Sequence, residues 1–249
     1  MKIGKMPYHG AMFQLVIRGK GAYTFLVMGD TGAGKSETLE AMRTIGAEEV
    51  EDLIIIADDM GSLQVDANGS ITGYGTETGA FVRLDDLQPG YAFGQIDRTI
   101  IMNPNQTNAR VVIPVTTFDN VSKGFKVDFV LYANNYEKVD DDHPVLQRFE
   151  TPEEALAVFR EGAVMSKGTT STTGLVRTYF ANIFGPTQYQ QMHDELAEIY
   201  FKAFFAEGAF VGQMRTQLGV PGKEHTGPEQ AARFLLEFLK NQEPKPEPQ

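Results

Sequence analysis

One short run in this chain has the residue types and spacing needed to hold phosphate groups. Residues 29–36 read Gly-Asp-Thr-Gly-Ala-Gly-Lys-Ser and fit the pattern GxxxxGK[S/T]. Glycines let successive backbone N–H groups point inward at an anion, the lysine reaches the outer phosphates, and the hydroxyl can ligate Mg²⁺. The residues predicted to bind a nucleoside triphosphate are therefore Gly29, Asp30, Thr31, Gly32, Ala33, Gly34, Lys35 and Ser36.

Two adjacent carboxylates could hold a metal ion near that run. Asp58 and Asp59 directly follow Leu53–Ala57, an apolar run that reads as a buried strand. If this strand lies beside the phosphate-binding run, its end brings a carboxylate within reach of Mg²⁺. One carboxylate can then hold the metal while the other accepts a proton. We predict metal ligation by Ser36, Asp58 and Asp59.

Two arginines are weaker candidates for contacts with a transferring phosphoryl group. Arg110 comes just before the apolar run Val111–Val115, and Arg83 lies within Ala80–Leu84. The planar guanidinium can clamp phosphate oxygens with two parallel hydrogen bonds. Read in isolation, Arg110 fits a surface or structural role better, and the same ambiguity applies to Arg83. The predicted catalytic residues are Lys35, Asp59, Arg110 and Arg83.

The segments that must position these side chains read as alternating strands and helices. Ala22–Met28 is rich in β-branched and aromatic residues and predicts a buried strand, and Lys35–Arg43 predicts a helix. The glycine-rich run thus lies between a strand and a helix, as a phosphate-binding loop requires. Further expected elements are a hairpin over Leu63–Tyr74 that turns at Asn68-Gly69, and strands over Arg98–Met102, Arg110–Val115 and Val127–Leu131.

The character of the sequence changes after about Pro144. Thr151, Pro152 and Glu154 form a capping-box pattern at the start of a helix that runs to about Arg160. The other expected elements are a polar loop over Ser166–Thr173, a helix from Pro186 to about Phe205 with Tyr189, Met192, Leu196 and Tyr200 on one face, an amphipathic helix over Pro228–Leu239, and a disordered tail over Asn241–Gln249.

Composition excludes several classes of function. The 249 residues carry a formal net charge of −11, which argues against non-specific nucleic-acid binding because such binding needs a basic face. The chain has no cysteine, so disulfides and thiolate chemistry are excluded. The apolar runs are too short to span a bilayer, and the N-terminus lacks the apolar core of a signal peptide. We expect a cytoplasmic protein with neither a nucleic acid nor a membrane as partner.

Two related families share motifs with this chain. The segment GDTGAGKSETLEAMR (Gly29–Arg43), followed by IIIADDM (Ile54–Met60), resembles the nucleotide site of HPr kinase/phosphorylase, in which a glutamate such as Glu37 is typical. Other segments resemble ATP-dependent phosphoenolpyruvate carboxykinase. They are NARVVIP (Asn108–Pro114), VDFVLYANNY (Val127–Tyr136), TPEEALAVFREGAVMSKGTTSTTGLVRTYFANIFGP (Thr151–Pro186) and GPTQY (Gly185–Tyr189). Together the matches cover roughly Gly21–Met192 in the family order.

The resemblance implies a fold and a set of roles. The fold would be α/β (mixed α+β), a carboxykinase-like P-loop domain over residues 1–240 with a mixed sheet flanked by helices. Gly32, Gly34 and Lys35 would cradle the phosphates of ATP, and Ser36 would bind Mg²⁺, or Mn²⁺ in its place. Asp58 and Asp59 match the acidic pair, with Asp59 the better candidate for a metal or base role. Arg110 matches the arginine that contacts the γ-phosphate, and Arg83 falls where the carboxykinases have a phosphate-contacting lysine.

Some positions depart from the carboxykinase pattern. The N-terminal domain that carries much of the oxaloacetate site has no counterpart in this sequence. The position of the metal-binding histidine expected upstream falls near Phe13 or Gln14, neither of which is a good ligand. His9 is a weaker candidate for another catalytic basic residue, because its spacing to Gly29 matches neither family well. Glu224 stands where an arginine contacts the adenine side, so base contacts do not transfer.

Three functions remain open from the sequence. The first is ATP- and Mg²⁺-dependent phosphoryl transfer of the carboxykinase type, and the second is a serine protein kinase of the HPr-kinase type. The third is a nucleotide-binding module without catalysis. The expected partners are a nucleotide and either a small-molecule or a protein phosphoryl acceptor.

Overall fold

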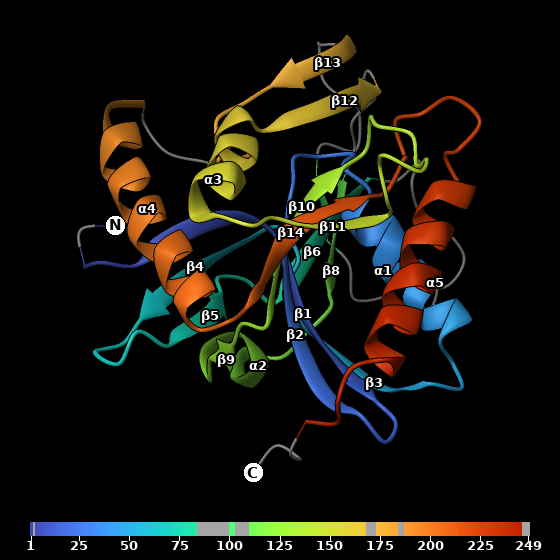
Figure 1. Ribbon diagram of the computed structural model, residues 1–249, viewed down its shortest axis with the longest axis horizontal. Helices are drawn as coiled ribbons and strands as arrows, with labels where there is room; N and C mark the ends of the chain where they lie inside the picture. Colours follow the sequence, from blue (N-terminus) through green and yellow to red (C-terminus); the bar gives the residue numbers. More distant parts are fainter. Residues whose placement is uncertain (2, 84–99, 103–109, 168–172, 184–186, 246–249) are drawn as a thin grey trace.

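A mixed β-sheet covered by helices on both faces forms the body of the protein in the computed structural model (Figure 1). The structure describes residues 1, 3–83, 100–102, 110–167, 173–183 and 187–245. Within those residues the main sheet has nine strands in the order β11-β14-β10-β2-β1-β4-β5-β9, and β3 pairs with β1 off this path. The expected mixed sheet flanked by helices is therefore confirmed.

The first strands of the sheet surround a long strand that the sequence did not predict. β1 (Met6–Ile17) pairs antiparallel with β2 (Gly21–Met28), β3 (Val50–Ala57) and β4 (Met60–Val65). Nearly all of its side chains are buried or half-buried, so it shows no alternation of apolar and polar residues. β4 and β5 (Ile71–Gly75) form the expected hairpin.

Parallel strands occupy the other half of the sheet. β10 (Phe129–Asn134) is parallel to β2 on one side and to β14 (Phe210–Arg215) on the other. β11 (Leu146–Arg148) closes this edge, and β9 (Phe125–Lys126) closes the opposite one. The carboxyl ends of β2, β10 and β14 therefore meet at one edge of the sheet.

Helices bury a separate apolar core on each face of the sheet (Figure 1). α1 (Lys35–Ile45) and α5 (Thr226–Lys240) pack together on one face, and α3 (Pro152–Glu161) and α4 (Gln190–Ala206) cover the other. At the start of α3 the Thr151 hydroxyl accepts a hydrogen bond from Glu154 N at 3.1 Å, as the capping pattern predicts.

The buried face of α4 differs from the predicted one. Its buried residues are His193, Ala197, Tyr200, Phe201 and Phe204, and only Tyr200 of the four predicted positions is among them. Met192 is 37% exposed. Ala197, Tyr200, Phe201 and Phe204 belong to the apolar core on this face of the sheet, and His193 Nε2 donates to Pro7 O of β1 at 3.1 Å.

Smaller elements complete the chain. A short 3-10 turn η3 (Thr187–Tyr189) precedes α4, and α2 (Phe118–Ser122) precedes β9. Two small sheets are formed by β12 (Ala163–Lys167) with β13 (Thr173–Arg177), and by β6 (Gly79–Arg83), β8 (Arg110–Pro114) and β7 (Ile100–Met102).

The C-terminal segment beyond α5 lies against the β1–β2 turn. Lys20 Nζ donates to Gln242 O at 2.8 Å, Tyr23 Oη donates to Glu243 O at 3.2 Å, and Lys245 pairs with Asp128. Residues 241–245 of the expected tail thus make defined contacts, and residues 246–249 lie outside the described residues.

Candidate functional site

The glycine-rich loop (Gly29–Ser36) leaves the carboxyl end of β2 and enters α1, as the sequence predicts. Gly34 precedes the helix with φ 90°, and no side chain caps the first turn of α1. The N–H groups of a helix start carry a partial positive charge and bind anions when no side chain takes them. Ser36 is exposed at this helix start. The loop therefore offers backbone donors and a hydroxyl to an anion or a metal ion.

Lys35 lies folded over the loop that it follows. Its ammonium group donates to Gly29 O at 2.6 Å and to Asp30 O at 3.1 Å. Burial lowers its pKa, and the carboxylate of Asp58 opposes this shift. Phosphate oxygens can replace the two carbonyls as acceptors and bring more negative charge than the carbonyls do.

The acidic pair reaches the same edge of the sheet by a different route from the predicted one. We expected a strand beside the loop, but β1 lies between β2 and β3. Because β1 is antiparallel to both neighbours, β2 and β3 run in the same direction and end at the same edge. Asp58 and Asp59 occupy the bend that follows β3.

Asp58 is half-buried, and one of its carboxylate oxygens is fully buried. Burial raises its pKa to about 6, against the opposing effect of Lys35 and with further support from Asp59 and Glu77. Its Oδ1 atom is buried and has no hydrogen-bond partner within the described part of the chain. A buried carboxylate oxygen of this kind is costly unless a cation or a donor completes it. This oxygen fits a metal ion or a bound proton.

Asp59 is the accessible member and lies beside His9. Its side chain is 39% exposed, and His9 Nε2 is 3.2 Å from Asp59 Oδ1. His9 Nδ1 hydrogen-bonds the carbonyl oxygen of Ala181, which can only accept, so Nδ1 carries a proton. In the neutral ring Nε2 is then an acceptor that faces the carboxylate, and both atoms are potential ligands of a cation.

Backbone contacts hold His9 between the loop and the acidic pair. Gly29 N donates to His9 O at 3.4 Å, and Gly10 N donates to Asp59 O at 2.9 Å. The segment that binds the imidazole has positive φ at Phe180, Ala181 and Asn182, which is uncommon for residues other than glycine. Such strain persists only where surrounding contacts impose it, and it clusters at functional sites.

Several residues near the loop had no role in the sequence analysis. Glu77 accepts a hydrogen bond from Met60 N at 3.0 Å, next to the acidic pair. Thr178 donates to Asp30 Oδ2 at 3.3 Å, and Asn135 and Thr216 donate to loop carbonyls. The polar pair Asn134-Asn135 after a buried strand is the one local signal that could have been followed.

The remaining predicted residues are placed as follows. Asp30 Oδ1 accepts from Thr31 N at 2.7 Å, and Thr31 is exposed. Arg83 and Arg110 are directly opposite each other on β6 and β8, so the structure brings the two predicted arginines together along the backbone. Their side chains lie outside the described residues.

Among the described residues no three histidine, aspartate or glutamate side chains converge to form a metal site on their own. The part of the chain that the structure describes contains no helix long and apolar enough to cross a membrane. No protein-family model matches this sequence, and no curated protein matches it.

Proposed function

We propose that this protein binds ATP with Mg²⁺ and transfers the γ-phosphoryl group, in a carboxykinase-like P-loop domain. One observation carries the proposal: the glycine-rich loop with Lys35, the acidic pair Asp58-Asp59 and His9 meet at one edge of the sheet. Each alone has an ordinary structural explanation. Their convergence supplies a phosphate cradle beside carboxylates suited to a divalent metal.

The residues present fit a Mg²⁺ ion. The buried, unpartnered Oδ1 of Asp58, the accessible Asp59 carboxylate and the exposed Ser36 hydroxyl are the oxygen ligands that this ion prefers. Bound there with the nucleotide, Mg²⁺ would neutralise charge on the phosphate oxygens.

The chain's own groups account for the transfer step. Lys35 would leave the carbonyls of Gly29 and Asp30 for the phosphates, and Arg110 would hold the γ-phosphoryl group with Arg83 assisting. An acceptor oxygen attacks the γ-phosphorus while the bond from that phosphorus to the oxygen of ADP breaks. Asp59 either orients the metal or takes the acceptor's proton.

A serine protein kinase is the second candidate. Glu37 and the Asp58-Asp59 pair are the features that it shares with HPr kinases. A carboxyl with a pKa of about 6, such as that of Asp58, is suited to accept a proton from a serine hydroxyl near neutral pH. The two candidate functions differ in the phosphoryl acceptor and use the same residues to bind ATP.

Transfer of labelled phosphate separates the candidates. The protein would be incubated with γ-labelled ATP, Mg²⁺ or Mn²⁺, and either oxaloacetate or a pool of small proteins. Label in phosphoenolpyruvate supports the carboxykinase type, and label on a protein serine supports the kinase. ATP binding without transfer to either acceptor would contradict catalysis and favour a binding module.

Asp59→Asn tests the catalytic assignment within that assay. We expect transfer to fall by at least about tenfold, because the neutral amide neither balances a metal charge nor accepts a proton. Asp141→Asn, at an exposed position, is the matched control and should transfer at the wild-type rate. An unchanged rate in Asp59→Asn would remove the assignment.

A further inference from the structure

Two fully buried polar side chains lie beneath the glycine-rich loop. Asn135 follows the end of β10 and Thr216 follows the end of β14, and both side chains are 0% exposed. Because these two strands are parallel to β2, their ends lie at the edge where the loop begins. The sheet order β14-β10-β2 thus brings both residues under the loop.

Each side chain donates to a loop carbonyl. Asn135 Nδ2 donates to Gly32 O at 2.8 Å, and Thr216 Oγ1 donates to Ala33 O at 2.7 Å. Asn135 also donates to Met165 O at 3.0 Å and accepts from Met165 N at 2.8 Å, so its amide group is fixed at both ends. An amide bonded at both ends cannot rotate to release the loop without leaving buried groups unpaired.

These bonds determine where the loop amides point. In a planar trans peptide, the C=O of one residue and the N–H of the next point in opposite directions. Thr216 holds the Ala33 carbonyl and thereby turns the Gly34 N–H away from the sheet. Asn135 holds the Gly32 carbonyl and thereby fixes the direction of the Ala33 N–H. That N–H donates to Asp30 O at 3.0 Å and closes the turn of the loop.

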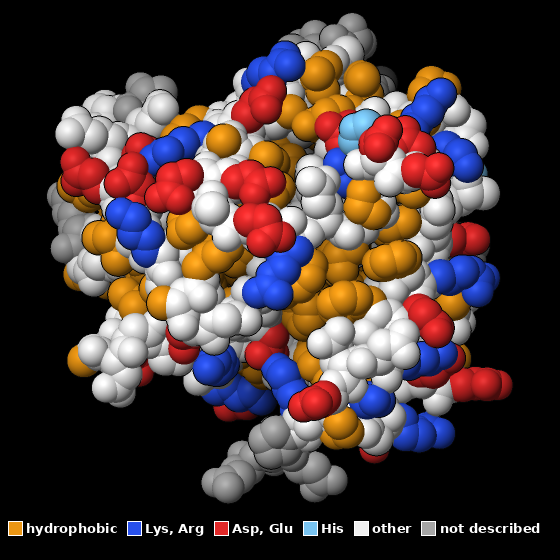
Figure 2. Space-filling view, in the orientation of Figure 1, with side chains coloured by type: hydrophobic (Ala, Val, Ile, Leu, Met, Phe, Trp, Pro, Cys, Tyr) orange, Lys and Arg blue, Asp and Glu red, His pale blue; other side chains and the backbone are white. Residues whose placement is uncertain are grey.

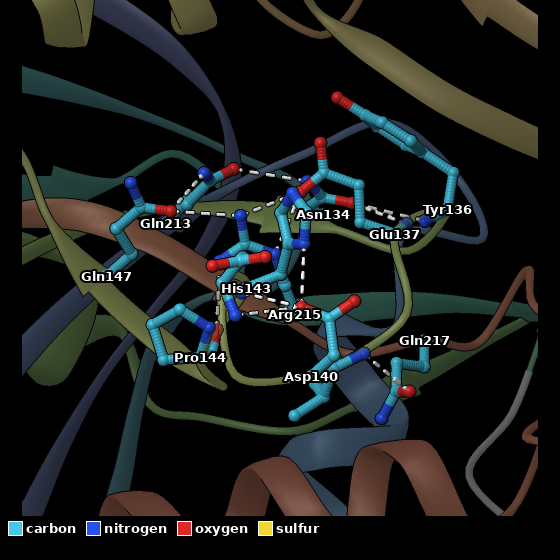
Figure 3. A network of polar contacts seen from close by, with 12 residues as sticks. Asn134, Tyr136, Glu137, Asp140, His143, Pro144, Gln147, Gln213, Arg215 and Gln217 are labelled. Atoms are coloured by element: carbon cyan, nitrogen blue, oxygen red, sulfur yellow. Dashed lines mark hydrogen bonds and ion pairs between the residues drawn. The ribbon is translucent and has the colours of Figure 1, made fainter.

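A network of polar contacts surrounds Arg215 and Asn134, the chain neighbours of these two residues (Figure 3). Arg215, next to Thr216, is 2% exposed and donates to Glu137 Oε2 at 2.8 Å and to Pro144 O at 2.8 Å. Asn134, next to Asn135, donates to Gln213 Oε1 at 3.1 Å. Thr216 N donates to Asn134 O at 2.8 Å, which joins the two strand ends directly.

We propose that Asn135 and Thr216 are positioning residues that hold the glycine-rich loop in its phosphate-binding shape before the nucleotide arrives. The proposal rests on the function proposed above. Groups that are held in the bound arrangement in advance spare the ligand the cost of ordering them. The two residues touch the loop carbonyls and leave the opposite side of the loop to the phosphates.

Thr216→Val tests this proposal because it keeps the shape of the side chain and removes only the donor. We expect the Kd for ATP with Mg²⁺ to rise about tenfold, as the loss of one buried hydrogen bond at the loop predicts. Thr216→Ser restores the hydroxyl and should bind with nearly the wild-type Kd. Calorimetric titration of the full chain measures all three, and urea unfolding gives their stabilities.

Thr24→Val is the matched control. Thr24 is 1% exposed on β2 and accepts a hydrogen bond from Gln14 at 3.0 Å, so this change also removes a buried hydroxyl from the sheet. It should lower stability and leave the Kd unchanged. If Thr216→Val does not fold, Thr216→Ala takes its place with the same expected rise in Kd.

The outcomes separate the positioning role from the proposed function. A wild-type Kd in Thr216→Val, or an equal rise in Thr24→Val, would overturn the positioning role while ATP binding stands. Failure of the Thr216→Ser rescue would also count against it. Absence of ATP binding by the wild-type chain would overturn the proposed function, and the positioning role with it.

Discussion

Two opposing effects act on the pKa of Asp58, which follows the end of β3. Burial penalises its charged form, and the nearby Lys35 ammonium favours that form. The first effect is the larger, so the pKa rises from its ordinary 3.8 to about 6. When Asp58 is ionised, its buried negative charge therefore destabilises the fold, as expected at a position where a cation binds.

Replacing Asp58 with asparagine should change how stability depends on pH. The folded protein keeps the Asp58 proton up to about pH 6, whereas the unfolded chain loses it near pH 3.8. The stability that this proton provides is present below pH 3.8 and is lost as the pH rises through 6. In metal-free buffer, Asp58→Asn should therefore be more stable than the wild type above that range, by at most on the order of 2–3 kcal/mol.

Urea unfolding at a series of pH values measures this difference. The gain will be below its upper limit because Lys35 loses a favourable neighbour in the variant. Asp141→Asn, exposed and distant from the loop in sequence, should follow the wild-type curve. Parallel curves for the wild type and Asp58→Asn would show that Asp58 does not carry the shift.

The elements of the site differ in how far local sequence predicts them. β2, the glycine-rich loop and α1 follow from short-range patterns and were predicted nearly to their ends. β1 was not, because both its faces are covered and its pairings with β3 and β4 join residues that are far apart in the sequence. Since His9 lies on β1, its position beside Asp59 could not be derived from spacing alone.

Gly32 and Gly34 of the loop both have positive φ, but the space available for a side chain differs between them. A Cβ at Gly34 would lie 2.5 Å from Thr216 Oγ1, whereas a Cβ at Gly32 would meet nothing within 4 Å. Both positions have φ values that cost an alanine roughly 1 kcal/mol. Gly34→Ala must in addition displace Thr216 and break its bond to Ala33 O.

Gly34→Ala should therefore destabilise the nucleotide-free protein by at least about 1 kcal/mol more than Gly32→Ala does, which is the net value of the lost hydrogen bond. Urea unfolding without nucleotide measures the stabilities of the two variants. Because no phosphate is bound, lost contacts to phosphate do not contribute to the difference. Equal losses of stability would mean that Thr216 moves aside freely and does not support the loop.

At the scale of the whole molecule, the protein is acidic, although its candidate ligand is an anion. With a net charge of −11, the chain as a whole repels a triphosphate. Acidic and basic side chains are interspersed on the face that Figure 2 shows, and the basic ones do not gather into one patch there. The proposed binding of a triphosphate therefore requires local donors, Lys35 and a metal that reduces the ligand's charge.

The two-sided architecture explains why the sequence predicted the segment of β2, glycine-rich loop and α1 better than its surroundings. The apolar cores on both faces of the sheet use residues from β1, α4 and α5 that meet only in three dimensions. The buried face of α4 was predicted wrongly for this reason, because its residues contact core residues from distant parts of the chain, and His193 donates to Pro7 O of β1. Asn135 and Thr216 likewise follow strands that become neighbours of the loop only through the sheet order.

Calorimetric titration of ATP into the full chain, with and without Mg²⁺, tests the central claim most directly. We predict saturable binding that requires Mg²⁺ and that weakens by about tenfold or more in Lys35→Ala, the loss expected for charge-assisted hydrogen bonds. Lys202→Ala, on the exposed side of α4, should bind like the wild type. Failure of the wild-type chain to bind ATP with Mg²⁺, or equal binding by Lys35→Ala, would contradict the assignment of Gly29–Ser36 as a phosphate-binding loop.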